Sequence, residues 1–438
     1  MTKNSTTIFL SFLLALINIP LLFDPDTLMS KYFLKILIVI SGFFILKNVA
    51  IMSRYKFEGF IDKQRSILFA LLLSYVLLII VSYIRAYLAL TLTFPEAFYT
   101  IILLVSLFLL LLTSTIIYKN SANLALYSLS IYIGLNLLLK FIGIDNPYST
   151  GYLRGQATIL SSMGIDINRI LFPLGGGGAT NFGTVSGLLS ALALVLFIVT
   201  KHRKLHYVII FLISAAIVLV TDTRGAMLSI FLTILVLLFF QLQKKIIHFF
   251  TPLLILLLPF LSTFLSILSD VAFYGAVRPG EDSLGRILIW RVAVSELADF
   301  STIHLIGFGA YGQTTSRVSY GYSFLFKDWL SDRPELFSLH NIALQTVFDI
   351  GYIGLIILLV ILAISMNIAS NMKTEVKYIL MAGLLFMMCA GSHDISLSFY
   401  SREVFIVFLL FVFTCIFYDP QEEEQNYAKE NKEVISLK

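Results

Sequence analysis

Long uninterrupted apolar runs constrain the fold of this chain more than any other feature of its sequence. A helix needs roughly 20 apolar residues to cross the hydrocarbon core of a membrane, and about twelve runs approach this length. They lie near 6–23, 32–52, 66–90, 97–118, 122–142, 177–200, 205–221, 225–241, 246–269, 341–369, 376–392 and 402–419. Because the runs are continuous and do not alternate with polar residues, they predict helices and not the strands of a membrane barrel.

The composition agrees with this interpretation. Hydrophobic residues make up 58% of the chain and charged residues only 13%, so the chain would not remain soluble outside a membrane. We therefore expect an all-α fold, a polytopic transmembrane helical bundle of about twelve spans. The cysteines, Cys389 and Cys415, lie inside separate apolar runs and are expected to be small core residues. The net charge of +5 does not require a nucleic-acid partner.

The distribution of lysine and arginine predicts the orientation of the bundle. If the N-terminus is cytoplasmic, most basic residues of the short connections fall on the inner side, as the positive-inside rule requires. The short outer connections then contain only Lys31, Arg85, Arg224 and Arg402. Both termini are expected on the cytoplasmic side.

The same orientation divides the chain into four regions. We expect the first nine spans in 1–269, with a periplasmic loop at 143–176, and a large periplasmic loop containing short helices at 270–339. The last three spans follow at 340–419, and 420–438 is a cytoplasmic tail. The outer segments contain several cations, which are either solvated surface residues or together bind an anionic ligand: Arg154, Arg169, Arg278, Arg286, Arg291, Arg317, Lys327 and Arg333.

Arg224 lies in a very tight connection between two apolar spans, Thr221-Asp222-Thr223-Arg224-Gly225. An arginine at this depth is costly unless an anion or a partner compensates its charge. One interpretation is an ion pair with Asp222. The other is a pyrophosphate bound by the guanidinium and by the backbone N–H groups at the start of the next helix.

Two further arginines fall on the helix predicted after the capping residues 281–283. At about 100° per residue, one polar stripe of this helix contains Arg291, Ser295 and Asp299. The apolar side contains Arg286, Trp290, Ala293 and Leu297. Because an arginine on an apolar face needs an anion, Arg286 is the stronger candidate for a ligand contact, and Arg291 is expected to pair with Asp299 or to remain solvated.

His340 directly precedes the apolar run at 341–369. The dipole at a helix N-terminus favours the neutral imidazole, which suits a general base facing an acceptor hydroxyl. A structural capping or interface role is the alternative. No second histidine or carboxylate follows at helical zinc-ligand spacing, so we expect neither a metal nor a cofactor.

Several motifs, taken in order, resemble the O-antigen ligase and O-antigen polymerase superfamily over residues 150–410. These motifs are Thr223-Arg224-Gly225, Gly285-Arg286 with Trp290, Gly307-Phe308-Gly309, and Leu339-His340-Asn341 followed by Gly351 and Gly354. A looser similarity to ligase sequences lies in Ser392-His393-Asp394 and Arg402.

The resemblance implies a metal-independent, inverting membrane glycosyltransferase of the bacterial inner membrane, with its site facing the periplasm. Arg224 and Arg286 would hold the diphosphate of an undecaprenyl-diphosphate-linked glycan donor, with Arg291 and Arg402 as further candidates. His340 would activate the acceptor hydroxyl or orient the donor, and His340 and Arg286 would be the catalytic residues. The expected partners are the donor, a glycan acceptor, membrane lipids and a regulator of chain length.

Polymerase is favoured over ligase because Phe172-Pro173-Leu174-Gly175, leading to Asn181-Phe182-Gly183, is similar to polymerases. A ligase would transfer the glycan to lipid A core instead. The alternative from another class is a transporter or flippase of lipid-linked oligosaccharides, since twelve spans are typical of transporters. The absence of a two-half internal repeat and the single large outer loop argue against this alternative.

Overall fold

The computed structural model describes residues 14, 28–52, 62–117, 122–144, 160–161, 164–165, 167–175, 179–200, 204–240, 252, 282–326, 333–372 and 374–418. Every regular element within these ranges is a helix, as the all-α prediction requires. The spans predicted at 6–23 and 246–269 lie outside the described residues, apart from Leu14 and Pro252. The predicted tail at 420–438 also lies outside them.

Ten long helices in the described ranges fall on ten of the predicted spans. They are α2 (Leu28–Met52), α3 (Lys63–Leu88), α4 (Phe94–Ile117), α5 (Ala122–Phe141), α7 (Ala179–Val199), α8 (Lys204–Val220), α9 (Arg224–Phe240), α14 (Ile342–Asn371), α15 (Thr374–Gly391) and α16 (Arg402–Phe417). Their ends differ from the predicted ends by only a few residues, because polar or turn-forming residues bound the apolar runs on which the prediction was based.

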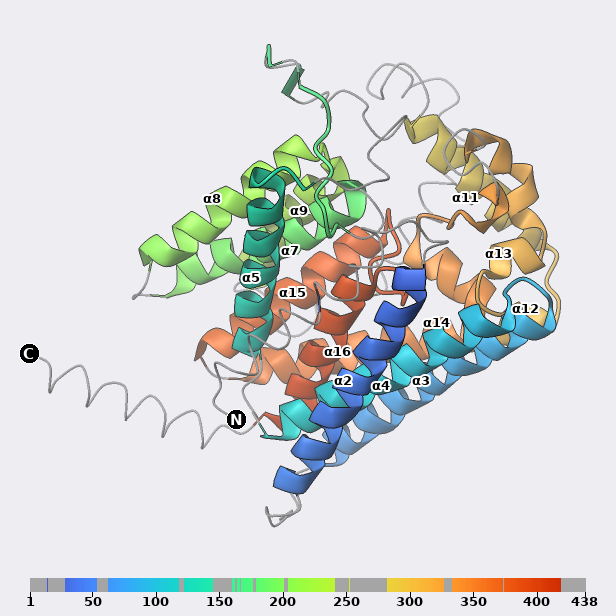
Figure 1. Cartoon of the computed structure of the whole chain (residues 1–438), viewed down its shortest axis with the longest axis horizontal. Coiled ribbons are helices and arrows are strands. Elements are labelled where there is room, and N and C mark those ends of the chain that lie inside the picture. Colours follow the sequence, from blue (N-terminus) through green and yellow to red (C-terminus); the bar gives the residue numbers. More distant parts are fainter. Residues whose placement is uncertain are drawn as a thin grey trace, which may run out of the picture.

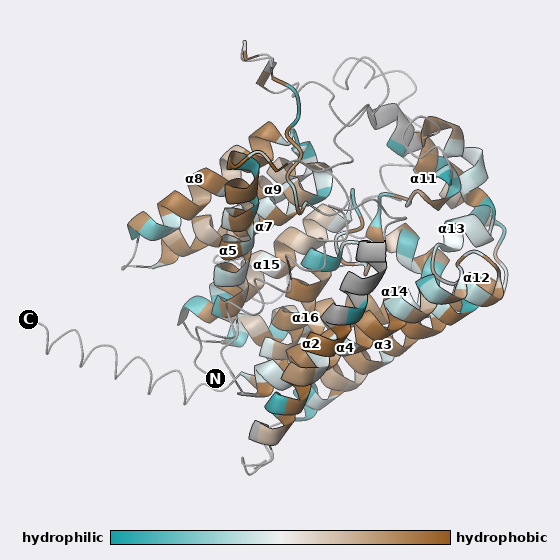
Figure 2. Cartoon of the chain, viewed as in Figure 1, coloured by the Kyte–Doolittle hydropathy of each residue, from teal (hydrophilic) through white to brown (hydrophobic). Residues whose placement is uncertain are grey.

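Five of the described helices are long and apolar enough to cross a membrane, namely α3, α4, α5, α7 and α14. Shorter apolar stretches occur at Ile38–Ala50, Lys204–Val220 and Arg224–Leu238. Figure 2 shows apolar residues along the long helices and hydrophilic residues mainly at helix ends and on the elements around α11 to α13. The chain is therefore a multi-pass membrane protein, while the number of twelve crossings stays a prediction.

Helices α15 and α16 lie at the centre of the bundle, between the group containing α7, α8 and α9 and the group containing α3 and α4 (Figure 1). Nearly all of α16 is buried, and four of its phenylalanines are fully so: Phe405, Phe408, Phe411 and Phe413. A Cβ at Gly383 of α15 would lie 2.0 Å from Cε2 of Phe411. Glycine at this position therefore lets α15 and α16 approach closely, as small residues do in membrane helix pairs.

Contacts between helix ends agree with the predicted alternation of chain direction. Near the ends of α2 and α4, Nδ2 of Asn48 donates a hydrogen bond to Oγ1 of Thr113 at 3.0 Å. At the starts of α7 and α16, Nδ2 of Asn181 donates to Oε2 of Glu403 at 3.1 Å. The first contact joins two ends predicted to be inside and the second joins two predicted to be outside. Which compartment each side faces stays a prediction.

The described residues from 282 to 341 include several helical segments, while the assignment of this region as a periplasmic loop stays a prediction. They are α11 (Asp282–Ala298), α12 (Ile303–Ile306), α13 (Gly312–Thr315) and the 3₁₀ helices η4 (Val318–Gly321), η5 (Ser323–Phe326) and η6 (Pro334–Leu336). Elements α11, α12 and α13 lie together beside one end of α14 (Figure 1).

Part of this loop forms hydrogen bonds with α14 next to a break in that helix. Gly351 has φ 80° and ψ 179° and interrupts the helix, so that carbonyls just before it become available to other donors. The N–H of Phe308 donates to the carbonyl of Phe348 at 2.6 Å. The N–H of Gly309 donates to the carbonyl of Asp349 at 3.1 Å. These backbone bonds fix the loop to the first half of α14, the half that follows His340.

Candidate active site

His340 lies immediately before α14, as predicted. Asn341 caps the helix, because its side-chain oxygen accepts a hydrogen bond from the N–H of Leu344 at 3.0 Å. His340 itself has φ 48°, a left-handed conformation that residues other than glycine adopt only occasionally. Its side chain is 21% exposed, so the imidazole is partly accessible.

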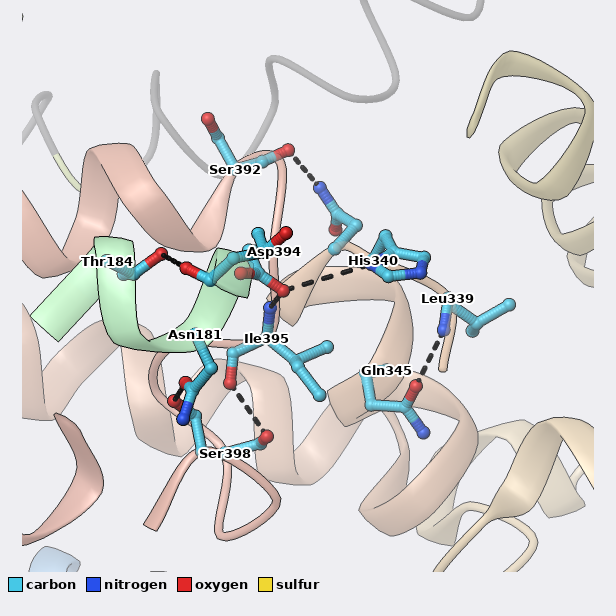
Figure 3. A network of polar contacts seen from close by, with 12 residues as sticks. Asn181, Thr184, Leu339, His340, Gln345, Ser392, Asp394, Ile395 and Ser398 are labelled. Carbon is cyan, nitrogen blue, oxygen red and sulfur yellow. Dashed lines mark hydrogen bonds and ion pairs between the residues drawn. The ribbon is translucent and has the colours of Figure 1, made fainter. Parts of the chain in front are cut away.

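The imidazole of His340 faces the carboxylate of Asp394 (Figure 3). Its Nδ1 atom lies 3.9 Å from Oδ1 of Asp394, which is within ion-pair range but too long for a hydrogen bond. In the part of the chain that the structure describes, Nδ1 is buried and has no hydrogen-bond partner. Nδ2 of Asn341 donates to the carbonyl of Ser392 at 2.6 Å. This bond ties the start of α14 to the turn after α15 and so brings the two side chains together.

Arg286 acts electrostatically on the same carboxylate. Burial raises the pKa of Asp394, but the interactions with His340 and with the charge of Arg286 outweigh burial and hold this pKa below its ordinary value. Asp394 is therefore ionised at neutral pH. An anion that stays charged beside His340 can orient the imidazole and stabilise its protonated form.

Helix α11 presents Arg286 from its buried side, as the helical-wheel argument predicts. The residues buried on that side include Ile289, Ala293 and Leu297. The residues exposed on the other side include Arg291, Ser295 and Asp299. Nε1 of Trp290 donates to the carbonyl of Leu339 at 2.9 Å, which anchors α11 next to the residue that precedes His340.

Arg224 is the first residue of α9, where the prediction placed it. Its Nε atom lies 3.8 Å from Oδ1 of Asp222, whose side chain is fully buried, whereas the side chain of Arg224 is 46% exposed. Both interpretations from the sequence are thus compatible with the geometry. One edge of the guanidinium is paired with Asp222, and nearly half of the Arg224 side chain is exposed.

Gly225 connects Arg224 to the turn after α15. A Cβ at Gly225 would lie 1.9 Å from Nε2 of His393, so the imidazole of His393 rests directly on the start of α9. Burial, and to a smaller extent the positive charge of Arg286, together lower the pKa of His393 to about 4. His393 is therefore neutral at pH 7 and packs against α9 without adding charge to the cluster.

Four segments that are distant in the sequence meet in this way at one end of the bundle. They are the start of α9, the buried face of α11, the start of α14 and the turn between α15 and α16. We call His340, Asp394, Arg286, His393 and Arg224 the site cluster. It combines an imidazole, a carboxylate that faces it within ion-pair range, and guanidinium groups suited to a phosphate ester.

The two other predicted diphosphate ligands have different surroundings. Arg291 is exposed on the side of α11 away from its buried residues. Arg402 begins α16 beside Tyr311, where burial raises the pKa of the tyrosine and the charge of Arg402 opposes that rise. The structure therefore brings Arg286 and His340 to the same carboxylate, while Arg224 is linked to this region through its neighbour Gly225, which contacts His393. Arg291 and Arg402 lie in other environments.

Sequence reasoning did not assign Asp394 and His393 to the site. The signal for them was weak, a Ser392-His393-Asp394 run in a predicted outer turn, because nothing local indicates which distant helix the turn contacts. Among the described residues, no group of three or more His, Cys, Asp or Glu side chains is arranged as a metal site.

The comparison with protein families bears on the same region. Residues 209–359 match a family described as O-antigen ligase, and this range contains Arg224, Arg286 and His340. No curated protein matches the chain. The resemblance predicted from the motifs is confirmed over residues 209–359, where this membrane protein is similar to the O-antigen ligase family.

Proposed function

We propose that the protein is an O-antigen polymerase, a glycosyltransferase that joins undecaprenyl-diphosphate-linked oligosaccharide repeat units into a surface polysaccharide. A hydroxyl of the acceptor attacks the anomeric carbon of the donor sugar. The bond from that carbon to the diphosphate breaks, and the configuration inverts. The family match supports an enzyme of the membrane that acts on lipid-linked glycans, and the bias of basic residues supports a site on the periplasmic face of the inner membrane.

The guanidinium groups would act on the leaving group. Negative charge grows on the diphosphate as the glycosidic bond breaks, and Arg286 and Arg224 would stabilise it through charge-assisted hydrogen bonds. Arg286 supports this role because it reaches the cluster from a buried helix face. The remaining exposure of Arg224 leaves room for an anion beside Asp222.

His340 would act on the acceptor. With a proton on Nδ1 directed at Asp394, the lone pair of Nε2 is free to take the proton of the attacking hydroxyl. The ionised Asp394 would then stabilise the imidazolium that forms. The 3.9 Å separation between Nδ1 and Oδ1 supports this scheme, because a small movement on substrate binding would close it to a hydrogen bond.

The observation on which this proposal mainly rests is the meeting of His340, Asp394 and Arg286 at one end of the bundle, although α11, α14 and the turn after α15 are far apart in the sequence. A protein with a purely structural role would not need an arginine and a histidine close to one carboxylate at a partly exposed position. A donor with a diphosphate leaving group needs both kinds of side chain.

A ligase that transfers the glycan to lipid A core is the second candidate, favoured by the description of the matched family. Polymerase is favoured by the similarity of the stretch from Phe172 to Gly175 to polymerase sequences. Deletion of the gene in its native strain separates the two functions. Surface glycan reduced to one repeat on the core supports polymerase, whereas free core with accumulated lipid-linked polymer means ligase.

A further inference from the structure

The peptide groups on both sides of Leu339 are held by side chains from two different helices. Its N–H donates to Oε1 of Gln345 at 3.0 Å, and its carbonyl accepts from Nε1 of Trp290 at 2.9 Å. Figure 3 shows the bond from Leu339 to Gln345, with His340 as the next residue. The backbone that leads into His340 is therefore fixed from α14 on one side and from α11 on the other.

The amide of Gln345 has only one orientation that satisfies its neighbours. Its Nε2 donates to Oδ1 of Asp349 at 3.0 Å and to Oε1 of Gln313 at 2.8 Å. Both of these atoms accept hydrogen bonds, so the nitrogen must face them and the oxygen must face Leu339. The side chain of Gln345 is fully buried, which makes a reversed amide costly.

His340 needs such support because its φ of 48° is unfavourable for a residue with a side chain. A conformation of this kind persists only where the surroundings determine it. Relaxation to a more common φ would swing the imidazole away from Asp394. We propose that Gln345 is a positioning residue that holds the backbone before His340, and thereby directs the imidazole at the acceptor.

This inference rests on the proposed function, because it assigns Gln345 a part in the same transfer reaction. The first test compares two substitutions. Gln345→Met preserves the shape but removes the acceptor for the N–H of Leu339. Gln345→Glu keeps that acceptor, and by sharing one proton with Asp349 it also keeps a bond to that carboxylate, although it gives up the bond to Gln313. Asn48→Leu is the control, since it also removes a buried amide, but where α2 meets α4 at the opposite end.

We expect Gln345→Met to lower kcat of glycan transfer about 100-fold, with KM for the donor nearly unchanged, because a misdirected base costs rate and not binding. Gln345→Glu should recover part of this loss, because it restores the acceptor for the N–H of Leu339. Asn48→Leu should lower thermal stability and leave kcat near that of the wild type. Equal kcat in Gln345→Met and Asn48→Leu, or no recovery in Gln345→Glu, would overturn the inference.

A chemical measurement tests the positioning independently of any activity. Diethyl pyrocarbonate modifies accessible imidazoles, and mass spectrometry gives the rate at each histidine of the full-length protein in detergent. We expect Gln345→Met to raise the rate at His340 several-fold relative to exposed His206, with Gln345→Glu and Asn48→Leu unchanged. An unchanged rate at His340 in Gln345→Met contradicts the positioning role. If the wild type transfers no glycan but these rates change as expected, the proposed function fails and the positioning of His340 stands.

Discussion

Gly225 and His393 lie so close together that any larger residue at the start of α9 would force the imidazole of His393 to move. A Cβ on Gly225 would lie 1.9 Å from Nε2 and 2.1 Å from Cδ2 of His393. This contact holds the turn after α15 against the start of α9, one residue after Arg224.

Gly225→Ala should therefore destabilise the protein by about 1–3 kcal/mol, the usual cost of overpacking. The added methyl group forces the imidazole of His393 to move. Thermal unfolding of the purified protein in detergent measures this loss. In a His393→Ala background the same substitution should cost little, because the clash is gone. An equal cost in both backgrounds would show that His393 is not the group with which the methyl collides.

The pKa of His393 predicts how stability depends on pH. It is lowered to about 4 in the folded protein, against about 6.5 in an unfolded chain. Between these values the unfolded state binds more protons, so stability falls as the pH falls from 6.5 toward 4. At pH 5 the free energy of unfolding is lower by about 2 kcal/mol because of His393. Asp394 does not change the stability between pH 6.5 and 4. Its pKa is lowered in the folded protein, so the stability that it contributes is lost only below about pH 3.9.

The His393→Gln variant provides the control for this pH effect. Its midpoint of thermal unfolding should decrease less between pH 7 and pH 5 than that of the wild type. Parallel decreases in the two proteins would assign the pH effect to other groups.

Two substitutions distinguish the role of Arg224 from that of Asp222. If Arg224 binds the diphosphate, Arg224→Ala should raise KM for the donor and lower kcat, since it removes charge from the leaving group. Asp222→Asn keeps the shape of the turn and the guanidinium but removes the ion pair measured at 3.8 Å. It should therefore retain most of the activity. Equal losses in the two variants would favour a purely structural ion pair.

Arg286→Ala and His340→Ala should each abolish glycan transfer while expression persists. Arg286→Ala removes a positive charge at the leaving group, and His340→Ala removes the general base. We therefore expect the rate of transfer to fall roughly 100-fold or more in each variant. Arg317→Gln is the control, because Arg317 is an exposed cation of the same loop and should tolerate the change. Transfer is measured with labelled lipid-linked donor in membranes that contain equal amounts of each protein. Near-normal transfer by either alanine variant would remove that residue from the site.

The positions of helices and the buried face of α11 could be predicted from the sequence because they depend on local periodicity. The apolar runs give the ten long helices almost to their ends. The spacing from Arg286 to Leu297 predicts a shared face, and Ile289, Ala293 and Leu297 are buried on it. His340 could be placed at a helix start because the apolar run begins immediately after it.

The partners of these residues could not be predicted, because they depend on which helix ends meet in three dimensions. Asp394 lies 3.9 Å from His340 across a separation of more than fifty residues and is in a turn without a regular pattern. The left-handed φ of His340 and the break at Gly351 depend on hydrogen bonds from the large loop. In the sequence Gln345 is a polar residue in an apolar helix, and nothing nearby predicts the three hydrogen bonds that its amide forms in the structure.

The most direct test of the account is reconstitution of the purified protein in liposomes with labelled undecaprenyl-diphosphate-linked repeat units. We predict longer lipid-linked glycans and released undecaprenyl diphosphate with the wild type, and neither product with His340→Ala or Arg286→Ala. Labelled glycolipid that crosses the bilayer without forming a glycosidic bond would contradict the account and indicate a flippase.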